Sequence, residues 1–192
     1  VKIGNQIWAT ENLKTTTLND GTPIVKDPTF WAKSSTEPRY CYFGDLPDSL
    51  KIILHLNIPL YNWYAVNTGK LAPLGWHVAS TAEWDTLENY LIAHNFDCDG
   101  KPNGNKIARA MSNKISWERA DSPIDNASGF NARISGWANF NGFRYFKDAM
   151  WWTSTSPNSY MGNTTSLLWL DDTLLFSGMP GSAAAAVRIV RD

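Results

Sequence analysis

The clearest hydrophobic pattern along the chain follows Ser80. Apolar side chains recur there at the spacing that places them on one face of a helix, with polar side chains between them. This apolar stripe consists of Trp84, Leu87 and Leu91. Ser80 and Glu83 have the spacing of a capping box, in which each side chain accepts a hydrogen bond from an otherwise unpaired amide. The sequence therefore predicts a helix that begins after Ser80 and runs to about His94.

Shorter patterns surround this helix. Residues 1–8 alternate apolar and polar side chains around a Gly-Asn pair, which predicts a β-hairpin. Residues 15–59 carry repeated turn signals with Pro and Gly, so we expect mostly loop with brief strands. A second, shorter helix is predicted around residues 107–111.

Beyond Trp117 the chain changes to short β segments. An Asn-Gly pair gives the strongest hairpin signal among them. The predicted segments are residues 130–134, 140–143, 151–154, 167–170 and 185–189. Two helices between an N-terminal strand and a C-terminal set of antiparallel strands indicate an α+β fold with the helices segregated from the sheet. The length fits a single domain, residues 1–192.

The composition excludes several classes of protein. Apolar residues make up 43% of the chain and charged residues 18%, which argues against disorder. The net charge is -1 and the chain has no basic block, so nucleic acid is not an expected partner. No apolar run is long enough to cross a bilayer, and we expect no transmembrane segment in this chain.

The first residue and the cysteines bear on the compartment. The sequence begins at Val1 without Met, and we expect that an export signal or an anchor was removed before this residue. Cys41 and Cys98 either form one disulfide or remain two buried thiols, because their spacing says nothing about proximity. The cysteine count therefore does not identify the compartment.

A series of short blocks, taken in order, resembles a known family. The blocks are residues 1–8, 11–13, 20–21, 40–42, 60–63, 65–66, 71–73, 75–78, 128–130, 151–154 and 187–192. Each block is short, but their number and order make the set specific. Together they span nearly the whole chain and resemble the Fibrobacter succinogenes major paralogous domain.

The resemblance implies a bacterial domain of exported, often lipid-anchored proteins. The implied location is extracellular or the outer cell surface, and the anchor would belong to a segment absent from this sequence. The implied fold is similar to the C-type lectin and formylglycine-generating enzyme group, with two helices packed on short twisted antiparallel strands and long loops. The family has no established activity, so the resemblance implies no catalytic residues, and function must be argued from the site.

The residues themselves offer few candidates for catalysis. Formylglycine-generating enzymes use a redox-active cysteine pair near the end of their domain, whereas this chain has no cysteine after Cys98. His55, His77 and His94 lie on separate segments without metal-ligand spacing, and His77 is interpreted as a core histidine. Acid pairs for glycoside cleavage are conceivable by residue type among Glu83, Asp85, Glu88, Asp171 and Asp172. We therefore assign no catalytic residue.

A turn-rich loop over residues 97–105 concentrates hard oxygen donors. Calcium is the cation that such carboxylate and amide oxygens would bind, and it is the only cofactor considered. The candidate ligands are Asp97, Asp99, Asn103 and Asn105. The loop departs from the EF-hand pattern, because its Gly comes too early and it has no closing Glu. The alternative is a solvated turn, with Asp and Asn serving turn and cap chemistry.

The aromatic residues of the late strands are the strongest ligand-binding candidates. Neighbouring side chains on a strand point to opposite faces, so we expect one of Trp151 and Trp152 to be exposed. An exposed indole beside Asp or Asn offers an apolar face for a sugar ring and polar groups for its hydroxyls. The candidate residues are Trp151, Trp152, Trp169, Asp171 and Asp172. The alternative is an indole covered by loops or by another chain. The core is expected to hold Trp8, Trp63, Trp76, Trp84 and Trp117.

The leading hypothesis is an exported, non-enzymatic binding or adhesion domain that recognises a glycan or a surface protein. Two alternatives remain open. One is a hydrolase acting on cell-surface polysaccharide, which requires two carboxylates, or a carboxylate and a histidine, in one cleft. The other is a structural spacer with no specific ligand.

Overall fold

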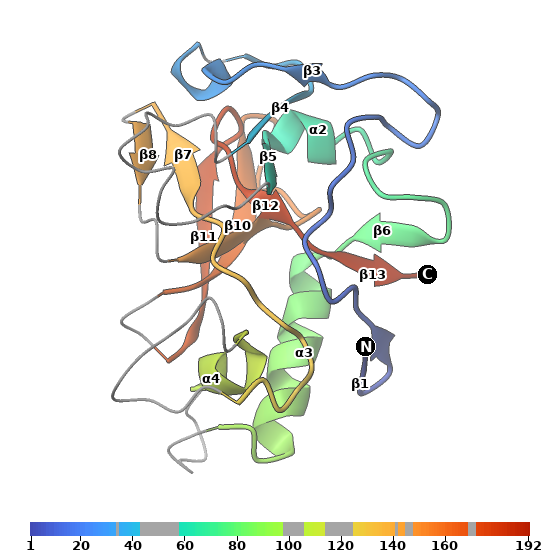
Figure 1. Ribbon diagram of the computed structural model, residues 1–192, viewed down its shortest axis with the longest axis vertical. Coiled ribbons are helices and arrows are strands. Elements are labelled where there is room, and N and C mark those ends of the chain that lie inside the picture. The colour runs from blue at the N-terminus through green and yellow to red at the C-terminus, as the bar shows by residue number, and fades with distance from the viewer. Residues whose placement is uncertain are drawn as a thin grey trace.

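The largest sheet of the computed structural model has four strands from the C-terminal part of the chain (Figure 1). The structure describes residues 1–33, 35–42, 58–97, 106–113, 125–140, 142–144, 148–168 and 172–192. The four strands are β9 (Ala149–Trp152), β10 (Met161–Leu167), β11 (Leu174–Pro180) and β12 (Ala186–Val187). Their order is β11-β10-β9-β12, and β12 runs parallel to β9 while the other neighbours are antiparallel. Strand β11 is therefore at one edge of this sheet.

Four small sheets surround this central sheet. The hairpin of β1 (Lys2–Ile3) and β2 (Gln6–Ile7) confirms the predicted N-terminal turn. Strand β7 (Trp137–Asn139) pairs with β8 (Gly142–Arg144), which confirms the second predicted hairpin. The third sheet consists of β3 (Val25–Lys26), β4 (Arg39–Tyr42) and β5 (Pro59–Tyr61). The fourth joins β6 (Trp76–Val78) to β13 (Ile189–Arg191).

The two ends of the chain meet beside β6. An isolated bridge pairs Trp8 with Val190, and the amide of Ala9 donates to the carbonyl oxygen of Ile189 at 3.1 Å. Figure 1 shows the N-terminal hairpin and β13 on the same side of the molecule. The first and last segments are therefore neighbours in the fold.

The long helix α3 (Thr81–Ala93) has the predicted position. Ser80 and Glu83 form both bonds of the capping box, and His94 is the C-cap residue. The predicted second helix is also confirmed, as the short α4 (Ala108–Met111). A 3-10 helix, η1 (Phe30–Ala32), and a four-residue helix, α2 (Trp63–Val66), were not predicted, because one turn is too short to show a helical period. No described helix has the length and apolar character needed to cross a membrane.

Two of the predicted C-terminal strands are wrong in extent. Residues 130–134 do not form a strand, and only Ala132 makes a bridge, to Ser112. Asn131 has a positive φ of 59°, a left-handed conformation that an extended strand cannot contain. The strand predicted at 167–170 overlaps β10 only at Leu167, where β10 ends; Leu168 is outside the strand, and residues 169–170 lie outside the described residues. The described part of the chain thus has few helices and many short strands in small sheets, an α+β arrangement.

Strand β9 of the central sheet is buried on both faces. Trp151 packs on one face with Trp8, Trp84 and Phe130, next to α3. Trp152 packs on the other face, in the cluster that includes Trp63 of α2. Of the tryptophans expected in the core, Trp8, Trp63 and Trp84 are buried and Trp76 is half-buried, while Trp117 lies outside the described residues.

Asn62 connects α2 to strand β4 and to the segment before it. Its side-chain oxygen accepts hydrogen bonds from the amides of Ala65, at 3.1 Å, and Arg39, at 3.0 Å. Its side-chain nitrogen donates to the carbonyl oxygen of Glu37 at 2.7 Å. Asn62 is fully buried and its bond with the Ala65 amide is buried, so water cannot replace the side chain at that amide.

The substitution Asn62→Ala is expected to lower the free energy of unfolding by about 2–4 kcal/mol, since it removes a helix cap and leaves buried polar groups unpaired. Urea denaturation measures this difference. Asn67→Ala is the matched control, because Asn67 is exposed at the other end of α2, and we expect a change within about 0.5 kcal/mol. Equal losses for the two variants would contradict this role of Asn62.

Candidate functional site

The predicted tryptophan site is not a surface site. Trp151 and Trp152 are both fully buried, so the expectation that one of them is exposed is wrong. The indole N–H of Trp151 donates to the side-chain oxygen of Asn12 at 2.8 Å, and that of Trp152 donates to the carbonyl oxygen of Tyr61 at 2.7 Å. The alternation of side chains holds, but other elements cover both faces of the strand. Neither ring offers a face to a ligand.

The acidic members of the predicted site are only partly described. Asp172 forms an ion pair with Arg109 of α4 at 3.3 Å, and its carbonyl oxygen accepts the amide of Ala108 at 2.9 Å. This residue therefore attaches the start of β11 to α4. Trp169 and Asp171 lie outside the described residues.

The predicted calcium loop also lies mostly outside the described residues. Asp97 is described and half-buried, whereas Asp99, Asn103 and Asn105 are not described. Cys98 lies in the same undescribed segment, and Cys41 is a buried thiol on β4. Within the described ranges, no three His, Cys, Asp or Glu side chains are grouped so that they could hold a metal ion.

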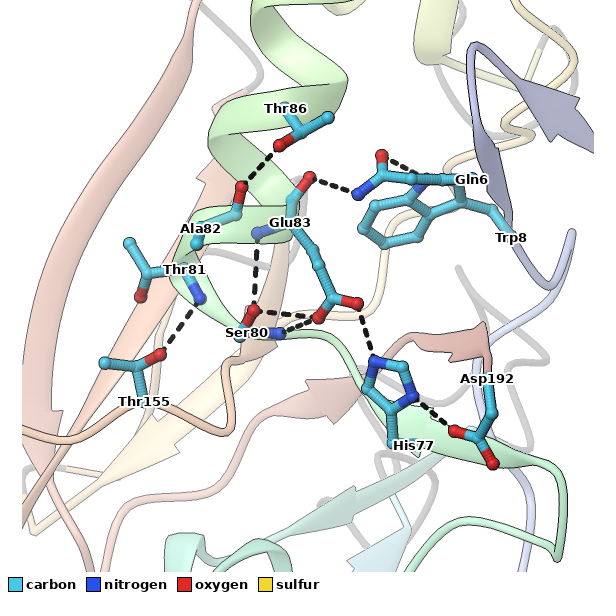
Figure 2. A network of polar contacts seen from close by, with 10 residues as sticks. All are labelled: Gln6, Trp8, His77, Ser80, Thr81, Ala82, Glu83, Thr86, Thr155 and Asp192. Atoms are coloured by element: carbon cyan, nitrogen blue, oxygen red, sulfur yellow. Dashed lines mark hydrogen bonds and ion pairs between the residues drawn. The ribbon is translucent and has the colours of Figure 1, made fainter.

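A network of hydrogen bonds and ion pairs among the described residues includes His77 and its two carboxylate partners (Figure 2). His77 lies on β6, Glu83 lies in the first turn of α3, and Asp192 follows β13. The Nε2 atom of His77 is 2.6 Å from Oε1 of Glu83, and its Nδ1 atom is 2.6 Å from Oδ1 of Asp192. We name these three residues the histidine clamp.

Local structure fixes the position of Glu83 in the clamp. Its second carboxylate oxygen accepts bonds from the amide and the hydroxyl of Ser80, both at 2.8 Å. Its carbonyl oxygen accepts a bond from the side-chain amide of Gln6 at 3.0 Å, and the oxygen of that amide accepts the Trp8 indole N–H (Figure 2). The clamp therefore connects the N-terminal hairpin, β6, α3 and the C-terminal end of β13.

The clamp favours the protonated imidazole. Partial burial by itself lowers the pKa of His77, but the hydrogen bonds and negative charges of Asp192 and Glu83 outweigh burial, so the net pKa is raised above its ordinary 6.5. Burial raises the pKa of Glu83, yet the hydrogen bonds from Ser80 and His77 outweigh it, and the net pKa is lowered below 4.5. The two shifts describe one ion pair seen from both partners.

The geometry of the clamp does not fit a histidine that activates a serine. A histidine that activates a serine needs one ring nitrogen facing the hydroxyl. Both ring nitrogens of His77 face carboxylates instead, and the Ser80 hydroxyl donates to Glu83. Both ring nitrogens of His77 have partners, but the interpretation of His77 as a core histidine is wrong in its placement, since the side chain is 41% exposed.

The meeting of these three groups was not predicted. The sequence pattern places Glu83 in the helix cap and among the acid candidates. His77 and Asp192 are 115 residues apart in the sequence, and no local pattern predicts their contact. The available signal was the strand–cap–helix order of residues 76–83, which brings a strand residue next to the first turn of the following helix.

A second surface candidate lies where β10 begins and β11 ends. The side chain of Tyr160 is exposed, and its carbonyl oxygen accepts the amide of Gly181 at 2.7 Å. A Cβ atom on Gly181 would lie 3.1 Å from the ring of Tyr64, which belongs to α2. The side chain of Asn158 is exposed and accepts the amide of Tyr160 at 2.9 Å. We name Tyr64, Asn158 and Tyr160 the tyrosine surface.

The histidine clamp is expected to make stability depend on pH. Because the pKa of His77 is raised, its contribution to the free energy of unfolding is complete below about pH 6.5. This contribution is lost as the pH rises through the pKa that His77 has in the folded state. The lowered pKa of Glu83 means that its contribution is present above about pH 4.5 and is lost as the pH falls through the folded-state value. The clamp should therefore stabilise most between these two pH values.

Urea denaturation of the wild-type chain and of His77→Gln measures this contribution. We expect a difference of about 1 kcal/mol or less near pH 5.5, because the pair is partly exposed, and a smaller difference at pH 8.5. Asp85→Asn removes a charge from the same helix without touching His77 and controls for net charge. A difference between wild type and His77→Gln that is equal at both pH values would rule out this role.

The comparisons with known proteins give one match. No curated protein and no solved structure matches the chain. The model of the Fibrobacter succinogenes major domain matches residues 1–191, which is nearly the full sequence and agrees with the order of blocks described above. The chain therefore belongs to the Fibrobacter succinogenes major domain family.

Proposed function

We propose that the chain is an exported, non-enzymatic binding domain that recognises carbohydrate through the tyrosine surface. The observation that carries this proposal is the exposure of Tyr160, whose side chain is 73% accessible to solvent. A phenol ring of this kind provides an apolar face for a sugar ring and a hydroxyl for hydrogen bonding. Asn158, whose side-chain oxygen accepts the backbone amides of Tyr160 and Met161, adds an amide group to the surface, and Tyr64, half-buried next to Gly181, adds a second ring.

The contacts that the acidic side chains make support a binding function over hydrolysis. Glycoside cleavage uses two carboxyl groups that face each other across the scissile bond. Glu83 and Asp192 instead contact the two nitrogens of the same imidazole. Asp172, another of the candidate acids, forms an ion pair with Arg109. These groups are engaged in holding the fold, which favours a binding role for the domain.

The finer architecture and the location are parts of the same proposal. A C-type-lectin-like fold is compatible with a long helix packed beside a small, mostly antiparallel sheet and with adjacent N- and C-terminal segments (Figure 1). Export and display on the outer cell surface, with a lipid anchor outside this sequence, follow from what the family resemblance implies. A glycan or a glycosylated surface protein is then the natural ligand.

A glycan array followed by titration calorimetry tests the binding proposal. We expect the wild-type chain to bind at least one glycan class, and Tyr160→Ala to weaken that binding by at least about tenfold, which corresponds to about 1.4 kcal/mol. Leu74→Ala is the control, because Leu74 is 84% exposed and lies just before β6, outside the tyrosine surface. Absence of any glycan binder, or equal binding by Tyr160→Ala, would overturn the proposal.

Surface display is tested on intact cells of the source bacterium. An antibody raised against the domain should label unpermeabilised cells, and external protease should remove the label because a displayed domain is accessible. A cytoplasmic protein detected in the same cells is the control for lysis. Labelling that requires permeabilisation would contradict the proposed location.

A further inference from the structure

Strand β11 has an open edge. It is the outer strand of the central sheet and pairs with β10 over seven residues, from Leu174 to Pro180. No described strand pairs with its other side, and within the described part of the chain residues 175–179 form no backbone hydrogen bond apart from the ladder to β10. Alternate amides and carbonyl groups of this strand therefore point away from the sheet, ready to pair with another strand.

The sequence of β11 lacks the features that usually protect an edge. Proteins usually prevent unwanted pairing at such edges with charged side chains, bulges or Pro. The seven residues of β11 include no charged residue, and the only Pro is Pro180, at the end. Phe176, Ser177 and Gly178 are exposed at the middle of the strand. An uncharged, exposed edge with an aromatic side chain suits strand pairing.

We propose that two copies of this chain pair through β11, antiparallel, with Ser177 facing Ser177 of the second copy. In this register Phe176 lies opposite Gly178 of the second copy, and the twofold axis repeats the same contact on the other side. The two sheets then form one continuous sheet of eight strands. This inference does not depend on the proposed function.

Gly178 provides the space for this pairing. Among the described residues, a Cβ atom built on Gly178 would meet the Cε of Met161, at 3.6 Å, and the carbonyl oxygen of Gly162, at 3.8 Å, both on β10 and at ordinary contact distances. Gly178 itself carries no side chain, so its backbone can be approached closely. An aromatic side chain directly across from a strand glycine covers its exposed backbone and stabilises the pair.

The symmetry of this pattern favours a second copy over an unrelated strand. Phe176 and Gly178 are placed at equal distances from Ser177, so the strand is complementary to itself in the antiparallel direction. An unrelated peptide would have to supply its own small residue opposite Phe176 and its own large one opposite Gly178. The strand already contains both.

Sedimentation equilibrium tests the pairing. We expect the average mass of the wild-type chain to rise with concentration from 21.5 kDa towards twice that value. Ser177→Lys and Ser177→Asp place like charges opposite each other at the twofold axis, and each should weaken self-association at least about tenfold. An equimolar mixture of the two variants should restore pairing, a result that a misfolded variant cannot give. A wild-type chain that stays monomeric at millimolar concentration overturns the proposal.

Cross-linking tests the register. Directly opposed residues of an antiparallel pair are close enough for a disulfide, so oxidised Ser177→Cys should form a covalent dimer beyond the background given by Cys41 and Cys98. Val25→Cys is the control, since Val25 is 53% exposed on β3, another edge strand. Equal yields for the two variants overturn the assignment of β11. Because glycan binding is measured separately with Tyr160→Ala, either proposal can fail alone.

Discussion

A buried guanidinium connects the parts of this fold. Arg188 is the single residue between β12 and β13 and is fully buried. It donates to the carbonyl oxygens of Ala9, at 2.8 Å, and Phe130, at 3.2 Å, and packs over the Phe130 ring at 4.4 Å. Burial lowers its pKa to about 9, which still leaves it charged at neutral pH. Removing a cation from water is costly, so these contacts must form together.

Aromatic rings pack together beside this cation, and two of them, Phe130 and Trp151, contact it. The ring of Trp84 lies 4.8 Å from Trp8 and is stacked on Trp151 at 5.4 Å, and both outer tryptophans also contact Phe130. These rings come from the N-terminal segment, α3, the segment before β7 and β9. Each large ring thus has a place in one packed cluster, and the high tryptophan content of the chain serves the core.

Local patterns were enough to predict the hairpins, the capping box and the two helices that follow it, because the interactions that define them lie within a few residues. The burial of both Trp151 and Trp152 could not be predicted in the same way. Alternation along a strand fixes opposite directions, but whether α3 or α2 covers each face depends on distant segments. The histidine clamp was missed for the same reason, since Asp192 reaches His77 only when β13 pairs with β6.

The adjacency of the two ends has a mechanical consequence. A pulling force applied between the first and last residues acts first on the contacts of the two terminal segments, which include the β1–β2 hairpin, the bridge between Trp8 and Val190 and the bond from Ala9 to Ile189. In an antiparallel arrangement these bonds open one after another, so the load does not reach the central sheet until the N-terminal segment has peeled away. Tension at the ends is therefore absorbed locally, while the opposite part of the molecule keeps its shape.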